Sequence, residues 1–278
     1  MKLLGLIGYP LSHSFSKKYF TQKFENEGLT HDWQYELFPI ESINQLPDLL
    51  RGHPNLVGLN VTIPYKEDVM YWLDELDETA EAIGAVNCIK IVNGKLNGYN
   101  TDYYGFQKSL LSPPRPQRGS LDVVHSEIEM EDNIEITDSL FGCGRGLDIK
   151  ALILGTGGSA KAVAYALKKL KIPYQYVSRH QSAHGLTYAD LDEAIMASHQ
   201  LIVNCTPLGM SPNTEGCSPI PYECLDNQHF MYDLIYNPEE TTFLKKGKER
   251  GAKVKSGLDM LHFQAEKGWE IWNEVYSF

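Results

Sequence analysis

Short apolar runs alternate with amphipathic stretches along the first part of the chain. Three runs are predicted to form buried strands: residues 3–8 (LLGLIG), 33–40 (WQYELFPI) and 56–63 (LVGLNVTI). The amphipathic stretches predict helices over 16–27, 43–50 and 65–82, and residues 85–100 predict a hairpin that turns at Asn93-Gly94. Because strands separated by helices need crossover connections, this pattern predicts an α/β fold with a mostly parallel sheet.

A second series of the same kind begins near residue 150. Its predicted strands are residues 150–155, 174–178, 201–205 and 231–236. Predicted helices cover 159–170 and 188–197, and a last helix, 258–276, carries Trp269 and Trp272. The return of the alternation indicates a second α/β domain.

Residues 112–149 lie between the two series and differ from both in composition. The segment opens with SPPRPQRGS, which is typical of a linker, and carries eight acidic residues against three arginines. Within SEIEMEDNIEIT, apolar residues alternate with glutamates, which is a strand pattern with an acidic outer face. Two interpretations stay open: an extra edge strand or hairpin guarded by charge, and a mobile acidic insertion. A specific binding role ranks behind both.

The overall composition is that of an ordinary globular protein, with 42% hydrophobic and 22% charged residues in 278. The 36 acidic residues against 25 basic ones give a formal net charge of -11, which argues against nucleic acid or an anionic membrane as main partner. No apolar run approaches the roughly 18 residues of a membrane span. The apolar start, MKLLGLIG, has no small-residue cleavage site, so we expect a first strand rather than a signal peptide, and a cytoplasmic protein.

The cysteines and histidines give no sign of a metal centre. The five cysteines form no CxxC pair and the nine histidines no HExxH motif. We therefore expect neither a disulfide framework nor a bound metal.

A glycine-rich turn carries the first sign of function. Residues 155–160 (GTGGSA) fit the GxGxxG/A pattern, directly after a predicted strand and at the start of a predicted helix. Such a turn lets the backbone approach a pyrophosphate, and the helix N-terminus offers N–H donors to it. The second strand of this series ends in Ser178-Arg179-His180 with no acid, and an arginine there pairs with a 2′-phosphate. The sequence thus predicts a dinucleotide site that favours NADP over NAD.

The catalytic candidates lie in the first series. Lys66 follows the strand that ends in NVTIP, and the carboxyl ends of parallel strands are where α/β proteins bind ligands. A lysine can donate a proton to a carbonyl oxygen as hydride reaches the carbon, and Asp102 can orient it by a hydrogen bond. Taken alone, Lys66 is also typical of a surface charge, and Asp102 of a turn or a helix cap. Ser14 and Ser16 precede a helix, where each is either an N-cap or part of a carboxylate site. Asn87 either binds a hydroxyl or merely begins the hairpin.

Eight motifs occur in one order along the chain: GYPLSHSFS, NVTIPYK, GAVNCI, NTD, GTGGSAKAV, NCTPLGM, DLIYNPEETTFL and GLDMLHFQA. In this set and order the chain closely resembles the shikimate dehydrogenases, over residues 3–110 and 149–275. The resemblance implies two α/β domains flanking a cleft. A substrate domain would cover 1–103, completed by the helix 258–278, and a Rossmann-type NADP-binding domain would cover 104–257, with the acidic insertion at about 112–149.

The resemblance also implies an activity and a set of site residues. The chain would reversibly reduce 3-dehydroshikimate to shikimate with NADPH, a step of aromatic amino-acid biosynthesis, as a monomer or homodimer. Lys66 would be the general acid/base, and Asp102 its partner and a ligand of a substrate hydroxyl. The other substrate contacts implied are Ser14, Ser16, Thr62, Asn87, Tyr236 and Gln264. The cofactor contacts implied are Gly155, Thr156, Gly157, Gly158, Ser159, Ser178 and Arg179 and, beside the nicotinamide, Glu78, Leu234 and Gly257.

One departure from the family pattern bears on the cofactor. Where the family has an Asn-Arg-Thr motif, this chain has Ser178-Arg179-His180. The family has a further basic residue three positions past the threonine, and Ala183 stands there in this chain, with His184 as a candidate replacement. This keeps an NAD-using quinate/shikimate dehydrogenase open as a rival interpretation.

Two other rivals are weaker. A non-catalytic sensor of NADP and shikimate would have no chemical need for both Lys66 and Asp102. A folate-type dehydrogenase of similar two-domain build would not explain the paired serines or Gln264.

Overall fold

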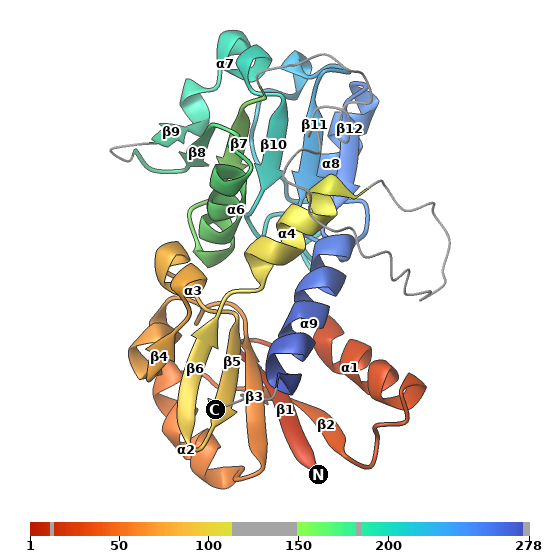
Figure 1. Cartoon of the computed structure of the whole chain (residues 1–278). Helices are drawn as coiled ribbons and strands as arrows, with labels where there is room; N and C mark the ends of the chain where they lie inside the picture. The colour runs from red at the N-terminus through yellow and green to blue at the C-terminus, as the bar shows by residue number, and fades with distance from the viewer. Residues whose placement is uncertain (12–13, 113–148, 182–184, 275–278) are drawn as a thin grey trace. The chain divides into compact units, whose positions relative to one another are not determined.

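The computed structural model describes residues 1–11, 14–112, 149–181 and 185–274 (Figure 1). The edge strand and the mobile insertion considered for 112–149 therefore lie outside the described residues, except at the two ends of that segment, and so does His184. Backbone contacts divide the chain into two units. The first comprises Met1–Gly105, Gly157–Ala166 and Leu261–Phe278, and the second comprises Phe106–Thr156 and Leu167–Met260.

A six-stranded mixed sheet forms the centre of the first unit, in the order β2-β1-β3-β5-β6-β4. Its strands are β1 (Lys2–Gly8), β2 (Trp33–Pro39), β3 (Leu56–Val61), β4 (Glu75–Leu76), β5 (Cys88–Val92) and β6 (Lys95–Tyr99). Strands β1, β2 and β3 run parallel, and β5 and β6 form the predicted hairpin with Asn93 and Gly94 at positive φ. The predicted α/β class is confirmed.

Both faces of this sheet are buried, which explains the continuous apolar run of β1. Leu3 and Ile7 join a core with α2 (Leu46–Gly52) and the loops after β3. Leu4 and Leu6 face the other way and pack with α1 (Phe15–Asn26) and α9 (Leu258–Asn273). A short 3-10 helix, Ile43–Gln45, precedes α2.

The helix predicted over 65–82 is wrong. The structure has a 3-10 helix at Asp68–Trp72, then β4, then α3 (Glu78–Ile83). The cause is a hydrogen bond to a neighbouring strand: the Asp74 carboxylate accepts from the backbone N–H of Leu96 at 2.7 Å, which holds the residues around Asp74 against β6 and interrupts the helix. Asp77 then caps a new helix by accepting from the N–H groups of Thr79 and Ala80.

The second unit contains a six-stranded parallel sheet in the order β12-β11-β10-β7-β8-β9. Its strands are β7 (Ala151–Leu154), β8 (Tyr174–Ser178), β9 (Gly185–Thr187), β10 (Leu201–Asn204), β11 (Phe230–Asp233) and β12 (Lys253–Ser256). Strand order reverses between β7 and β10, and ligands of such sheets bind at the carboxyl ends on either side of that reversal.

Helices α7 (Glu193–Ser198) and α8 (Thr242–Glu249) cover one face of the second sheet. Short 3-10 helices lie at Tyr188–Asp190 and Tyr222–Cys224. The predicted helix 188–197 is thus two elements, because Asp192 caps α7 by accepting from the Ile195 N–H. The sequence pattern also missed α8, β9 and β12.

Two further helices, α4 (Asp102–Leu111) and α6 (Gly158–Lys169), have residues in both units, as α9 does. On the second sheet, Phe106 of α4 packs edge-on against the Tyr232 ring of β11. In the part of the chain that the structure describes, no helix has the length and apolar character that crossing a bilayer would require.

Candidate active site

A lysine and an aspartate form the centre of the polar network in the first unit. Lys66 lies in the segment after β3, and Asp102 is the first residue of α4. The Lys66 Nζ donates to Asp102 Oδ2 at 2.7 Å, and the two side chains are only 15% and 8% exposed. The predicted hydrogen bond between them is therefore present, and its shielding from water holds the ammonium in one place.

Asn87 occupies the other carboxylate oxygen. It stands directly before β5, and its amide donates to Asp102 Oδ1 and Thr101 Oγ1, each at 2.9 Å. The amide also lies 3.4 Å from the side-chain oxygen of Gln264 on α9. Both Asp102 oxygens are thus bonded, and three residues that are far apart in sequence meet at one point.

Asn100 and Thr101, the residues before Asp102, hold Asp102 and Asn87 in position by hydrogen bonds, and neither was predicted as a site residue from the sequence. Asn100 Oδ1 accepts the backbone N–H groups of Asp102 (3.0 Å) and Tyr103 (3.3 Å), which caps α4. Its amide donates to the Ala85 carbonyl at 2.9 Å, and the Thr101 N–H donates to Asn87 Oδ1 at 2.6 Å. The signal was available in the NTD motif, since Asn before a helix is a common cap.

The serines lie at the start of α1. Ser14 holds the N-cap position but accepts no hydrogen bond from the helix. Its Oγ is buried and, among the described residues, is the single buried side-chain oxygen or nitrogen without a partner. A buried hydroxyl of this kind at a helix N-terminus is suited to a ligand anion.

Ser16 and Thr62 lie against the same sheet. Burial raises the pKa of the Tyr35 hydroxyl well above its usual range, and a hydrogen bond with Ser16 opposes the rise. Thr62 follows β3 and lies beside the end of β1, because its N–H donates to the Ile7 carbonyl at 3.0 Å.

The glycine-rich turn follows β7 in the second unit. Gly155 has φ +109°, which a residue with a side chain rarely adopts, and its N–H donates to the Val177 carbonyl at 2.9 Å. Thr156 and Gly157 follow it, and the space beside the Gly157 Cα is open. The backbone here is accessible to a ligand, as a phosphate turn requires.

The next residues group with the first unit and reach Lys66. A Cβ on Gly158 would lie 3.1 Å from the Lys66 Cβ, and the Ser159 hydroxyl accepts from Lys66 Nζ at 3.1 Å. Gly158 and Ser159, the end of the predicted pyrophosphate turn, thus lie beside Lys66 within the first unit. Sequence reasoning did not foresee this contact, because nothing in the spacing links positions so far apart.

Ser178 is the last residue of β8, and Arg179 follows it. The Ser178 hydroxyl donates to the His180 carbonyl at 2.5 Å, and Arg179 is exposed. Burial raises the pKa of the Tyr188 hydroxyl, and a hydrogen bond with Ser218 and the nearby Arg179 charge oppose the rise. Arg179 thus lies just past the carboxyl end of β8, the strand next to β7, which leads into Gly155.

Leu234 and Gly257 meet at the ends of β11 and β12. A Cβ on Gly257 would lie 2.1 Å from the Leu234 carbonyl oxygen, so the two backbones approach too closely for any side chain there. Tyr236 is half-buried two residues past Leu234. Glu78 is exposed in the first turn of α3, in the other unit.

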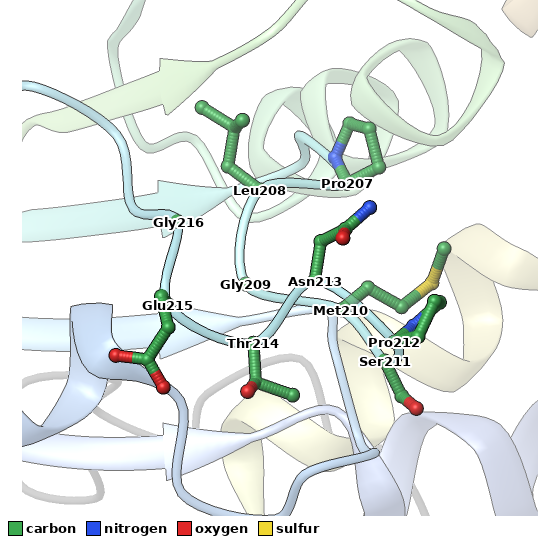
Figure 2. A pocket seen from close by; sticks show the side chains of 10 residues that line it. All are labelled: Pro207, Leu208, Gly209, Met210, Ser211, Pro212, Asn213, Thr214, Glu215 and Gly216. Atoms are coloured by element: carbon green, nitrogen blue, oxygen red, sulfur yellow. The ribbon is translucent and has the colours of Figure 1, made fainter.

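A loop after β10, residues 207–216, lines an open pocket of about 530 Å³ in the second unit (Figure 2). Gly209, at φ +97°, lies against Gly216, whose carbonyl oxygen would be 2.9 Å from a Cβ at position 209. The sequence pattern singled out only the start of this loop, as the NCTPLGM motif. In residues 1–11, 14–112, 149–181 and 185–274, no cluster of three histidine, cysteine or acidic side chains is arranged to hold a metal.

Comparisons with known proteins agree with this arrangement. Residues 6–89 match the model of the shikimate dehydrogenase substrate binding domain. The chain is 37% identical to the shikimate dehydrogenase (NADP(+)) of Clostridium beijerinckii, over 99% of this chain and 93% of that protein.

Two solved structures are similar over nearly the whole chain. A shikimate dehydrogenase in complex with NADP+ is 32% identical, with a TM-score of 0.76, over 99% of this chain and 91% of that one. The enzyme of Thermus thermophilus in complex with NADP(H) and shikimate is 27% identical, with a TM-score of 0.77, over 99% and 94%. With more than a third of its residues identical to a relative along almost its full length, the chain belongs to the shikimate dehydrogenase family.

Proposed function

We propose that the protein catalyses the reversible, NADPH-dependent reduction of 3-dehydroshikimate to shikimate. The observation that carries the proposal is the shielded Lys66–Asp102 pair, with Asn87 and Gln264 around it. A dehydrogenase of this kind needs one group that gives a proton to the carbonyl oxygen and takes it back in reverse. Lys66 is that group.

Lys66 acts through its position. In the reduction the Lys66 ammonium donates one proton to the substrate oxygen that becomes the hydroxyl. Asp102 Oδ2 accepts a hydrogen bond from the same ammonium and keeps it in place. Asn87 fixes Asp102 by bonding to its second oxygen, so the carboxylate cannot rotate away. The geometric contribution of such positioning is the larger part of the rate, and the proton transfer adds ~10²–10⁴-fold.

Ser14 supports a substrate with a carboxylate. Its buried hydroxyl lacks a partner, and it stands at the N-terminus of α1, where backbone N–H groups and the helix dipole favour an anion. We assign Ser14, Ser16 and Thr62 to the substrate carboxylate. Gln264, beside Asn87, and Tyr236 complete the proposed substrate contacts.

The residues after β7 and β8 fit NADP(H). Gly155 to Ser159 combine a positive φ, open backbone and a helix N-terminus, which suits a pyrophosphate. Arg179 is exposed after β8 with no acid beside it, which suits a 2′-phosphate. We assign Ser178 to the same ribose and Glu78, Leu234 and Gly257 to the nicotinamide side. The cofactor, when bound, supplies the hydride.

We also propose that the protein works in the cytoplasm, as a monomer or homodimer. The four described cysteines (Cys88, Cys205, Cys217 and Cys224) are free thiols, which a reducing compartment maintains.

The decisive experiment follows NADP+ reduction by absorbance at 340 nm with shikimate, beside wells with quinate and with NAD+. We expect turnover with shikimate and NADP+, and much less with either replacement. Comparable turnover with quinate or NAD+ would move the protein to the broader quinate/shikimate group. Binding of shikimate without turnover by any pair would make it a sensor instead.

A further inference from the structure

Four polar side chains of the second unit are completely buried and have no part in the mechanism above. They are Asn204, Ser218, Asp233 and Thr241, each 0% exposed. Burying a polar side chain costs free energy unless its hydrogen bonds are satisfied, so a cluster of four calls for an explanation.

Asn204, the last residue of β10, bonds to both ends of loop 207–216. Its Oδ1 accepts from the Thr206 hydroxyl at 2.7 Å and the Thr206 N–H at 3.2 Å, just before the loop. The same oxygen accepts from the Ser218 hydroxyl at 3.2 Å, just after it. One amide oxygen thus fastens the entry and the exit of the loop.

Asp233, at the end of β11, holds Asn204 in this orientation. Its Oδ1 accepts from the Asn204 amide at 2.9 Å and from the Ile235 N–H at 3.0 Å. Its Oδ2 accepts from the Thr241 hydroxyl at 2.6 Å. Because the Asn204 amide faces a carboxylate, the side chain cannot flip, and its oxygen must point toward the loop.

The loop leaves the sheet beside the glycine-rich turn. Strands β7 and β10 are neighbours at the reversal of strand order, and a Cβ on Gly155 would lie 3.4 Å from the Thr206 Cγ2. Figure 2 shows the loop folded back on itself around its pocket, with Leu208 and Met210 among the lining side chains. Both apolar side chains are about two-fifths exposed, at 40% and 42%.

We propose that Asn204 and Ser218 are positioning residues for NADP(H): they hold both ends of loop 207–216 in register with the phosphate turn. This inference rests on the proposed use of NADP(H). A loop fixed at both ends binds a ligand without first losing conformational freedom, whereas a loosened loop must be ordered at the cost of affinity. The effect belongs to cofactor binding and not to the proton transfer at Lys66.

Ser218→Ala tests the proposal, because it frees the exit of the loop and leaves Asn204 and Thr206 in place. We expect the KM for NADP+ to rise about fivefold, as for one buried hydrogen bond of ordinary strength. The kcat and the KM for shikimate should stay within twofold of the wild type. Hydrogen exchange of the backbone amides of residues 207–216 should also accelerate.

Ser109→Ala is the matched control. Ser109 is also a serine with 0% exposure in the second unit, and its hydroxyl accepts from the Tyr232 hydroxyl at 2.8 Å, as Ser218 has a hydrogen bond with Tyr188. It should lose a similar amount of thermal stability with the KM for NADP+ unchanged. Equal KM values for NADP+ in the two variants, or a Ser218→Ala variant that loses stability alone, would overturn the proposal.

The wild-type protein separates this proposal from the function itself. If it does not reduce NADP+ with shikimate, the proposed function fails before any variant is compared. If it does, and loop 207–216 exchanges no faster in Ser218→Ala, only the role of Asn204 and Ser218 is wrong.

Discussion

At the scale of single residues, Lys66 should carry the proton transfer. Lys66→Ala removes the group that donates to the carbonyl oxygen, so we expect kcat to fall by ~10²–10⁴-fold. Shikimate binding, measured by calorimetry, should persist, because Ser14, Ser16 and Asn87 remain. Lys95→Ala is the control: Lys95 is a 64% exposed lysine of the same unit, paired with Glu75, and its loss should leave kcat unchanged. Unchanged turnover in Lys66→Ala would remove Lys66 from the mechanism.

Arg179 is expected to distinguish the two nicotinamide cofactors. It is exposed after β8, and a charge-assisted bond to a 2′-phosphate is lost in Arg179→Ala. The KM for NADPH should rise roughly 10- to 100-fold, and the KM for NADH, which has no such phosphate, should change little. Steady-state kinetics with both cofactors measure this directly. A parallel change in the two values would mean that Arg179 does not contact the phosphate.

At the scale of elements, the cap of α4 positions Asp102. Asn100→Ala removes the acceptor for the N–H groups of Asp102 and Tyr103, which should cost about 1 kcal/mol of stability. It should also lower kcat, because the backbone that carries Asp102 loses its anchor to the Ala85 carbonyl. Asn100→Ser keeps a capping oxygen and should recover most of the stability, as judged by urea unfolding. Full activity in Asn100→Ala would show that Asp102 holds its place without the cap.

Helices and strands could be predicted from the sequence where the local pattern of apolar and turn residues alone determines the secondary structure. The strand 3–8 and the hairpin at Asn93-Gly94 follow from a buried run and a turn dipeptide, and both are present. The helix at 65–82 failed because Asp74 bonds to β6, a partner that no local pattern reveals. The same limit hid the buried pair of Asn204 and Asp233, each of which stands in the sequence as an ordinary polar residue at the end of an apolar run.

For the candidate site, the sequence could nominate residues but not their contacts. Lys66 and Asp102 were paired on chemical grounds, and their hydrogen bond is present at 2.7 Å. The bond from Lys66 to Ser159 joins positions 93 residues apart and depends on packing of the whole first unit. The roles assigned to these residues stay predictions until the variants are measured.

At the scale of the whole molecule, stability should depend on pH through one buried and one half-buried carboxyl group, Asp233 and Glu266. Burial raises the pKa of Asp233 to about 6 in the second unit. Burial and repulsion from Glu270 raise the pKa of Glu266 to about 7 in the first unit, but the ion pair with Lys23 at 2.9 Å favours the charged carboxylate, so Asp233 is the clearer case. The folded state then binds these protons more tightly than the unfolded chain does. Their contribution to stability is full below about pH 4 and is lost as the pH rises through 6 and 7.

We therefore expect the free energy of unfolding to decrease between pH 5 and pH 8, with Asp233 contributing about 1.4 kcal/mol, since only about one pH unit of this range lies below its folded pKa of about 6. The net charge of -11 acts in the same direction, since acid also reduces self-repulsion, so the slope of the wild type alone does not identify the cause.

The Asp233→Asn variant isolates the contribution of Asp233. This variant removes one titrating group, and its unfolding free energy should change less over that range than that of Asp48→Asn, which alters a 75% exposed carboxyl. Identical slopes in the two variants, measured by urea unfolding at pH 5, 6, 7 and 8, would mean that Asp233 titrates as it does in the unfolded chain. Its three hydrogen bonds would then offset the cost of burying its charge.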